Sequence, residues 1–191
     1  MPKIRGGSLE EHRQRTRSEI FEAFARLLKV RTFDTISLAD IAAEAAVGRT
    51  AIYNHFPDKE AVVLAFATEE TEQYIARLEE SLVDAEGPVA AMRMYVRNHL
   101  AMSKDLHLGL GPALYGMLSP GSLLEIRTHV QMVERVVRGI LQDGIASGDF
   151  VDQDVDSAVT LVHSTLHSAS ERLPADDIEG FLLRALGARL S

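Results

Sequence analysis

The sequence predicts an all-α fold, with a small N-terminal head of three helices and a larger C-terminal helical domain. Apolar residues recur at spacings of three and four along the 191 residues, which is the period of an amphipathic helix. Alternation of β-branched residues, which is typical of strands, is scarce. Pro, Gly and N-capping residues divide the chain into helices with clear ends.

The composition excludes several classes of protein. With 46% hydrophobic residues the chain can bury a core, and with no cysteine it has no disulfide framework, thiolate zinc site or cysteine nucleophile. The N-terminus has charges but no apolar signal segment, and charges interrupt every longer apolar run. We therefore expect a cytoplasmic protein that is neither secreted nor membrane-spanning.

Charge is distributed unevenly around a net value of −8. Residues 1–60 contain ten Lys or Arg and nine Asp or Glu, whereas the rest of the chain contains ten and nineteen. Residues 1–17 alone contain five basic and two acidic side chains. The front of the chain is the part suited to nucleic acid, although a short basic segment is also typical of a solvated tail.

The first helix is predicted over residues 15–30. It contains one apolar stripe, formed by Ile20, Phe21, Phe24, Leu27 and Leu28. Residues 1–14 are predicted as a flexible basic arm, with Gly6-Gly7 as the break before the helix. Such an arm can contact a nucleic-acid backbone or minor groove, or remain disordered.

A strong start signal precedes the second, short helix, predicted over residues 38–45. Ser37 and Asp40 have the spacing of a capping box. Ile36 and Ile41 occupy the two positions of a hydrophobic staple around the same start.

The third helix is predicted over residues 49–55. Pro57 disfavours helical backbone at Phe56, ends this helix and opens the fourth, over residues 57–82. Two short helices joined by a tight turn, behind a longer bracing helix, are the parts of a helix-turn-helix. Ile52 and Phe56 share the face expected to pack in the core, which leaves the opposite face for a DNA major groove.

The C-terminal part is predicted to continue as helices to its end. Their expected ranges are 89–104, 110–118, 123–146, 154–172 and 175–190, with Gly148 ending the longest of them. We assign residues 15–60 to a DNA-binding helix-turn-helix domain and residues 61–191 to an effector-binding and dimerisation domain.

Residues 15–66 resemble the DNA-binding head of the TetR family of bacterial transcriptional regulators. The resemblance rests on the segment TISLADIAAEAAVGRTAIYNHFPDKEAVV, residues 35–63, with its Ile-Ala helix, its Tyr-x-His-Phe group and its Lys-Glu pair. Three positions depart from the family pattern. Ala46 and Thr32 replace glycines, and Gly48 replaces a serine, so either Ala46 adopts a left-handed conformation or the turn shifts and Gly48 relieves it.

The resemblance implies DNA contacts along this segment. Those closest to base edges are Arg49, Thr50 and Asn54, and those at phosphates are Tyr53, His55 and Lys59, with Ser37 capping the second helix near a phosphate. Each has a structural alternative. Tyr53 can pack its ring, His55 can bond within the turn, and Lys59 can pair with an acidic neighbour.

The resemblance also implies a homodimer that binds a palindromic double-stranded operator, because one recognition helix covers only a few base pairs. The expected dimer interface comprises Val155, Val159, Val162, Leu166, Phe181, Leu182 and Leu186, which fit an intramolecular core equally well. The expected effector pocket comprises Met92, Tyr95, His99, Met102, Leu114, Tyr115, Met117, His129 and Met132, where ordinary core packing is the alternative.

The combined prediction is a repressor whose operator binding is modulated by a small, largely apolar effector. The alternative is a helical dimeric module that binds a small molecule or metal and has lost DNA binding. His163 and His167 stand at the i, i+4 spacing of a metal pair, but no third ligand can be placed, so no metal or cofactor is expected. An enzyme is disfavoured because no phosphate loop or nucleophile elbow accompanies the histidines.

Overall fold

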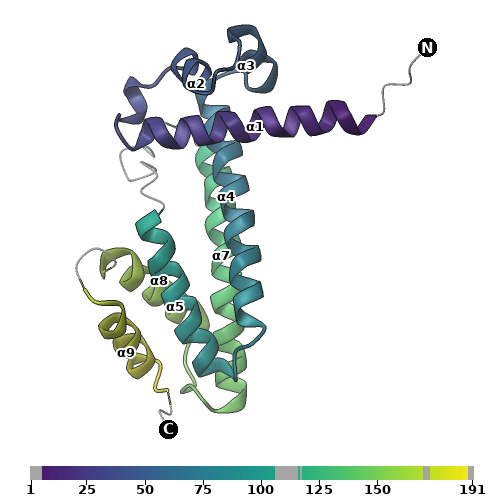
Figure 1. Ribbon diagram of the computed structural model, residues 1–191. Coiled ribbons are helices and arrows are strands. Elements are labelled where there is room, and N and C mark those ends of the chain that lie inside the picture. Colours follow the sequence, from purple (N-terminus) through teal and green to yellow (C-terminus); the bar gives the residue numbers. More distant parts are fainter. Residues whose placement is uncertain (1–5, 106–115, 117, 170–172, 189–191) are drawn as a thin grey trace. The chain divides into compact units, whose positions relative to one another are not determined.

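The computed structural model describes residues 6–105, 116, 118–169 and 173–188, and these confirm the all-α fold, with no strand among them (Figure 1). The helices are α1 (Gly6–Leu28), α2 (Leu38–Glu44), α3 (Arg49–His55), α4 (Lys59–Leu82), α5 (Pro88–Asp105), α7 (Pro120–Ser147), α8 (Val155–Ala169) and α9 (Ala175–Ala185). A short 3-10 helix, η1 (Phe33–Thr35), lies between α1 and α2.

The chain divides into two compact units. The first comprises Met1–Thr68 and His107–Ile126, and the second comprises Glu69–Leu106 and Arg127–Ser191. The boundary therefore lies inside α4 and not at residue 60. Two helices, α4 and α7, contribute residues to both units.

The first unit is built on an aromatic core. Phe66 of α4 meets Phe21 and Phe24 of α1 edge to face, with ring centroids 5.6 and 5.7 Å apart. Ile41 of α2 and Ile52 of α3 are fully buried in the same cluster. Figure 1 shows α2 beside α3, and the shared core fixes both short helices on α1.

Helix α1 begins earlier than predicted, at Gly6, so residues 6–14 are helical and do not form a flexible arm. Residues 8–17 contain several Glu, Arg and Gln and no Pro, and these residue types favour a helix without tertiary support. The Gly6-Gly7 pair begins this helix.

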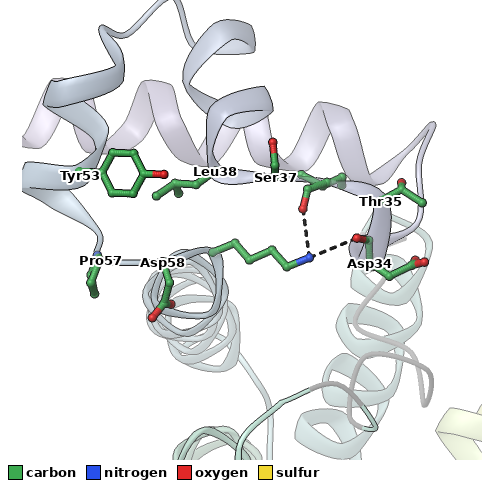
Figure 2. A pocket seen from close by; sticks show the side chains of 9 residues that line it. Asp34, Thr35, Ser37, Leu38, Tyr53, Pro57 and Asp58 are labelled. Carbon is green, nitrogen blue, oxygen red and sulfur yellow. Dashed lines mark hydrogen bonds between the residues drawn. The ribbon is translucent and has the colours of Figure 1, made fainter.

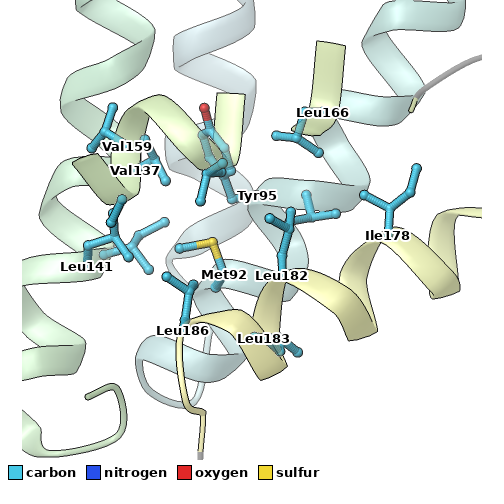
Figure 3. Close-up of a cluster of buried hydrophobic side chains, with 14 of the residues drawn as sticks. Met92, Tyr95, Val137, Leu141, Val159, Leu166, Ile178, Leu182, Leu183 and Leu186 are labelled. Atoms are coloured by element: carbon cyan, nitrogen blue, oxygen red, sulfur yellow. The ribbon is translucent and has the colours of Figure 1, made fainter. Parts of the chain in front are cut away.

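The second unit has a larger apolar core to which α4, α5, α7, α8 and α9 all contribute (Figure 3). Met92 and Tyr95 of α5, Leu141 of α7, Leu166 of α8 and Ile178 of α9 are among its most deeply buried side chains. This core explains why the C-terminal helices are apolar on more than one face.

The ends of the C-terminal helices follow the predictions with local differences. Helix α7 begins at Pro120, three residues early, because proline suits the first helical turn. It ends before Gly148, whose φ of +77° provides the left-handed cap that the sequence predicts. Helix α9 ends at Ala185, before the predicted residue 190. Most of the helix predicted over residues 110–118 lies outside the described residues.

Candidate nucleic-acid interface

Helix α3 has one buried face and one exposed face, as its sequence predicts. Ile52 is fully buried in the core. Arg49, Thr50, Tyr53 and Asn54 are exposed, and about half of the Tyr53 surface is accessible. Guanidinium, hydroxyl and amide groups therefore stand together on an outer face that the core holds rigid.

Ser37 forms the capping box that the sequence predicts. Its Oγ accepts a hydrogen bond of 3.1 Å from the Asp40 N–H, and Asp40 Oδ2 accepts from the Ser37 N–H at 2.8 Å and from its hydroxyl at 2.7 Å. These Ser37 bonds, with a smaller effect of Arg31, lower the pKa of Asp40. The Ser37 hydroxyl proton is thus donated to Asp40, and Ser37 fixes where α2 begins.

The turn between α2 and α3 adopts the first of the two expected geometries. Ala46 has a φ of +53°, in the left-handed region, and Gly48 has an ordinary φ of −59°. The Val47 N–H still bonds the Ala42 carbonyl oxygen at 2.9 Å, so the turn closes in spite of the alanine. Gly48 caps α3 without a side-chain hydrogen bond, since it has no side chain.

The Lys59 side chain reaches back to the segment before α2. Its Nζ donates to the carbonyl oxygens of Phe33 at 2.9 Å, Ile36 at 3.0 Å and Asp34 at 3.4 Å. It also lies 4.3 Å from the centroid of the Phe33 ring. All three ammonium protons have an acceptor within the chain, so Lys59 holds the segment before α2. The phosphate contact expected of Lys59 stays a prediction.

An open hollow of about 390 Å³ lies beside Lys59, between the segment before α2 and the ends of α3 and α4. Tyr53, Ser37, Asp34 and Asp58 are among the residues that line it (Figure 2). Lys59 lines the hollow as well, and the Asp58 carboxylate is engaged by the Ala61 N–H at 2.8 Å.

His55 is half-buried at the end of α3 and faces basic residues of α1. Burial lowers its pKa, and the positive charges of Arg13, Arg17 and His12 lower it further. The guanidinium of Arg17 lies 5.7 Å from the Phe56 ring centroid. Helix α1 therefore places positive charge next to α3. His12 and Arg13 belong to the extension that the prediction of a flexible arm missed, whereas Arg17 lies in the predicted helix.

Glu60, in the first turn of α4, is a further contact that sequence reasoning missed. Its Oε1 accepts from the Ser119 N–H at 2.6 Å, just before α7 begins. Hydrogen bonds from Ser122 and Ser119 lower the pKa of Glu60. The Lys-Glu pair of the family pattern points to Glu60, but nothing in that pattern predicts Ser119 as its partner.

The residues expected to line an effector pocket are only partly described. Tyr95 and Met92 lie in the core of the second unit, with His99 on the same helix. His129 is buried and Met132 half-buried on α7. The side chain of Met102 and the residues Leu114, Tyr115 and Met117 lie outside the described residues.

The predicted dimer interface needs a correction. Five of its seven side chains are buried within the chain itself, at 4% exposure or less: Val159, Val162, Leu166, Leu182 and Leu186. They form the intramolecular core that the sequence left as the alternative, and they offer no surface to a partner. On the same two helices Leu161 and Phe181 are 66% and 55% exposed, and Val155 is half-buried.

The histidine pair predicted at metal-ligand spacing does not converge on one site. His163 Nε2 is hydrogen-bonded to Tyr95 Oη at 2.6 Å, whereas His167 is exposed. In the described part of the chain no three His, Asp or Glu side chains gather closely enough to hold a metal ion. None of the helices described there combines the length and the apolar character needed to cross a membrane.

Comparison with known proteins adds an independent observation on the first unit. The family model of the bacterial regulatory proteins of the tetR family matches residues 20–66. An 86-residue segment is 41% identical to HTH-type transcriptional regulator TtgR of Pseudomonas putida and, separately, to the probable HTH-type transcriptional regulator ArpR of that species. Each match covers 44% of this chain and 40% of the relative's length.

Solved structures resemble this chain over most of its length. The fatty acid degradation regulator FadR from Bacillus halodurans has a TM-score of 0.77 at 19% identity, over 91% of this chain and 97% of its own. FadR from Bacillus subtilis in complex with stearoyl-CoA has a TM-score of 0.77 at 19% identity, over 88% and 96%. A putative regulator from Saccharomonospora viridis in complex with choline has a TM-score of 0.77 at 18% identity, over 91% and 96%. At identities of 18–19%, these comparisons show that the folds are similar and do not show a shared ligand or function.

Proposed function

Because the chain belongs to the TetR family of bacterial regulatory proteins, we propose that it is a sequence-specific DNA-binding transcriptional regulator that acts as a repressor. The observation that supports this most is the exposed face of α3, where Arg49, Thr50, Tyr53 and Asn54 stand over a fully buried Ile52. A short helix held by its inner face and polar on its outer face suits insertion into a major groove.

We assign different roles to the residues of this surface. Arg49 and Asn54 read base edges, because a guanidinium suits guanine and an amide suits adenine. Thr50 and Tyr53 add hydroxyl contacts to bases or phosphates. Ser37 and Lys59 act as positioning residues that fix the start of α2, and His55 contributes as an uncharged donor at the edge of the surface.

Helix α1, with its extension, supplies phosphate contacts in this proposal. Arg13 and Arg17 act electrostatically on His55, so they lie close to the end of α3. Cations next to a recognition helix add sequence-independent affinity that falls as salt rises. A rigid helical extension reaches fewer phosphates than a flexible arm, but it loses less conformational entropy on binding.

The active form is proposed to be a homodimer in the cytoplasm, bound to a palindromic operator. Leu161 of α8 and Phe181 of α9 are the exposed apolar residues that a second copy would cover. Sedimentation velocity of a Phe181→Glu variant should show a shift from dimer toward monomer. Val83→Glu, at an even more exposed apolar residue just after the end of α4, should leave the dimer intact, and equal behaviour of the two variants would contradict the assignment.

The effector is proposed to be small and largely apolar and to bind in the second unit. Two regulators of the same fold were solved in complex with stearoyl-CoA and with choline, so the fold alone does not determine the ligand. The ligand of this chain is determined by its own side chains. An effector that binds better to a conformation unsuited to DNA lowers operator affinity by that difference. Helix α4 contributes residues to both units and is the element proposed to carry the change.

A selection experiment tests the DNA-binding function. Duplexes bound by the protein are selected from a random library, and affinities for the winning sequence are measured by fluorescence anisotropy at several salt concentrations. Arg49→Ala should weaken binding about tenfold or more, since a base-reading Arg contributes about 1–3 kcal/mol. Arg77→Ala, which removes an equal charge from an exposed site in the second unit, is the matched control.

Two outcomes would overturn the proposal. One is a library from which no sequence is enriched. The other is binding that Arg49→Ala and Tyr53→Ala leave unchanged. A folded dimer that binds small molecules but no DNA would identify the chain as a binding module instead.

A further inference from the structure

Four ring side chains meet inside the apolar core of the second unit. Tyr74 comes from α4, Tyr95 and His99 from α5, and His163 from α8. The Tyr95 ring stacks on His163 with an interplanar angle of 8° and lies 6.0 Å from His99, centroid to centroid. Tyr74 meets His99 edge to face at 6.4 Å. We call these four residues the aromatic cluster.

One half of the aromatic cluster has its hydrogen bonds satisfied. Tyr95 Oη lies 2.6 Å from His163 Nε2. Glu134 Oε1 lies 4.0 Å from the other ring nitrogen, Nδ1, so the tautomer with its proton on Nδ1 is favoured. Nε2 then accepts, and the Tyr95 hydroxyl donates to it.

The other half is unsatisfied. Tyr74 Oη and His99 Nδ1 are both buried and have no hydrogen-bond partner in the described part of the chain. Tyr74 as a whole is only 4% exposed, so bulk water does not reach its hydroxyl. A buried polar group left without a partner costs about 1–3 kcal/mol, which makes two neighbouring ones an unstable arrangement unless something binds there.

Both groups are uncharged at neutral pH. Burial raises the pKa of Tyr74 far above its ordinary value and lowers the pKa of His99 to about 4. Tyr74 therefore offers a hydroxyl proton, and the imidazole of His99 offers a neutral ring nitrogen. Two cations of α5, Arg93 and Arg97, both bind Glu179.

We propose that Tyr74 and His99 form the polar end of a binding site for an uncharged, largely apolar ligand that carries a hydroxyl group. One ligand hydroxyl can accept a hydrogen bond from Tyr74 Oη and donate one to His99 Nδ1, so a single group gives both unsatisfied atoms a partner. A carboxylate would enter without a counter-charge and would meet Glu134 across His163. An ammonium group would lose its hydration, because in the described part of the chain no carboxylate bonds either of the two unsatisfied atoms.

This inference rests on the proposed function in that the ligand is the effector, and it names the chemical class of that effector. Tyr74 lies on α4, the helix that also carries Lys59 and Glu60 at its start. A ligand bound to Tyr74 therefore acts directly on the helix proposed to connect effector and operator.

Isothermal titration calorimetry on the DNA-free protein tests the site with three probes. They share a propylphenyl group and differ in the polar group: 4-propylphenol, 4-propylbenzoate and 4-propylbenzylamine. At pH 7.5 they are neutral, anionic and cationic. The phenol should bind with a Kd below about 1 mM, and each charged probe at least about tenfold more weakly. Tyr74→Phe should weaken phenol binding about five- to thirtyfold, the equivalent of one lost hydrogen bond.

Tyr53→Phe is the matched control, since it removes the same hydroxyl from the exposed face of α3 and should leave phenol binding unchanged. Circular dichroism melting establishes that both variants fold. The inference would be overturned by a charged probe that binds as tightly as the phenol, or by a Tyr74→Phe variant whose phenol affinity is unchanged. It would also be overturned if no probe binds, because a resident water then satisfies both groups. Operator binding measured in parallel separates the two proposals, since DNA binding without probe binding leaves the proposed function standing.

Discussion

Lys59 Nζ lies 2.9 Å from the carbonyl oxygen of Phe33 and 4.3 Å from the centroid of the Phe33 ring. One ammonium group thus holds both the backbone and the side chain of a residue 26 positions earlier. The same ammonium bonds the carbonyl oxygen of Ile36, immediately before the capping residue Ser37. The beginning of α2 therefore depends on a side chain from the beginning of α4.

Lys59→Met should lower stability and weaken DNA binding without changing its salt dependence. Removing charged hydrogen bonds and a cation–π contact should cost about 1–2 kcal/mol of folding free energy, measured by urea denaturation. The slope of log K against log salt should stay constant, because a side chain that contacts no phosphate releases no counterion.

A fall of that slope by about one would show that Lys59 contacts a phosphate after all. Lys59→Arg should rescue little, since a planar guanidinium cannot direct its donors at three converging carbonyl oxygens as an ammonium does. Lys29→Met, at an exposed position after the end of α1, is the control for loss of one positive charge.

Ala46→Gly should stabilise the protein by about 1 kcal/mol. Ala46 has a φ of +53°, where a Cβ is strained and glycine is not. The neighbouring Ala45 has a φ of −78° and an ordinary helical conformation, so Ala45→Gly should destabilise by about 0.5–1 kcal/mol. Urea midpoints that move in the same direction for both variants would contradict strain at Ala46.

The helix-turn-helix could be predicted because its signals are local. The Ser37 and Asp40 capping box and the stop at Pro57 act over three or four residues, so sequence spacing describes them completely. The partner of Lys59 could not be predicted in the same way, because it is a backbone carbonyl brought near by folding.

Periodicity also predicted which faces of α8 and α9 are apolar, but not what covers them. Val162 and Leu182 pack against the chain's own core, whereas Phe181, one residue from Leu182, is exposed. The choice between a core and a dimer interface depends on the crossing of helices that are distant in the sequence. The early start of α1 has a different cause: Gly6-Gly7 is typical of a break, but the helix formers that follow it determine where the helix begins.

Glu179→Gln should destabilise the packing of α9 on α5. Glu179 is only 4% exposed, with Oε1 2.5 Å from Arg93 Nη1 and Oε2 2.6 Å from Arg97 Nε. Removing the buried charge breaks both pairs, and because the two arginines are partly exposed we expect a loss of about 1–3 kcal/mol in urea denaturation.

Asp176→Asn is the matched control for Glu179→Gln, since Asp176 is largely exposed and meets Arg97 at 3.5 Å. A surface pair of this kind should contribute less than about 0.5–1 kcal/mol. Equal effects of the two variants would show that burial of Glu179 adds nothing to its ion pairs.

Stability should fall as the pH drops from about 6.5 toward 4, because of His99. Burial, with a smaller effect of His163 and His167, lowers the pKa of His99 from 6.5 to about 4. The unfolded chain binds a proton in this window and the folded chain does not, so acid favours unfolding. Between pH 7.5 and 5 the loss should reach about 2 kcal/mol, to which the lowered pKa of His163 adds in the same direction.

Urea denaturation at pH 7.5 and 5 measures this loss above the ordinary carboxyl pKa values of 3.8 and 4.5. Below these values Asp34, Asp40 and Glu60, whose pKa values are lowered by folding, add a loss of their own. His99→Phe should remove most of the difference between the two pH values, whereas His12→Gln, at an exposed position of α1, should leave it. Because folded His99 stays mostly neutral at both pH values, 4-propylphenol should raise the stability of the wild type by about the same amount at pH 7.5 and at pH 5. A pH dependence that survives His99→Phe unchanged would contradict the assignment to His99.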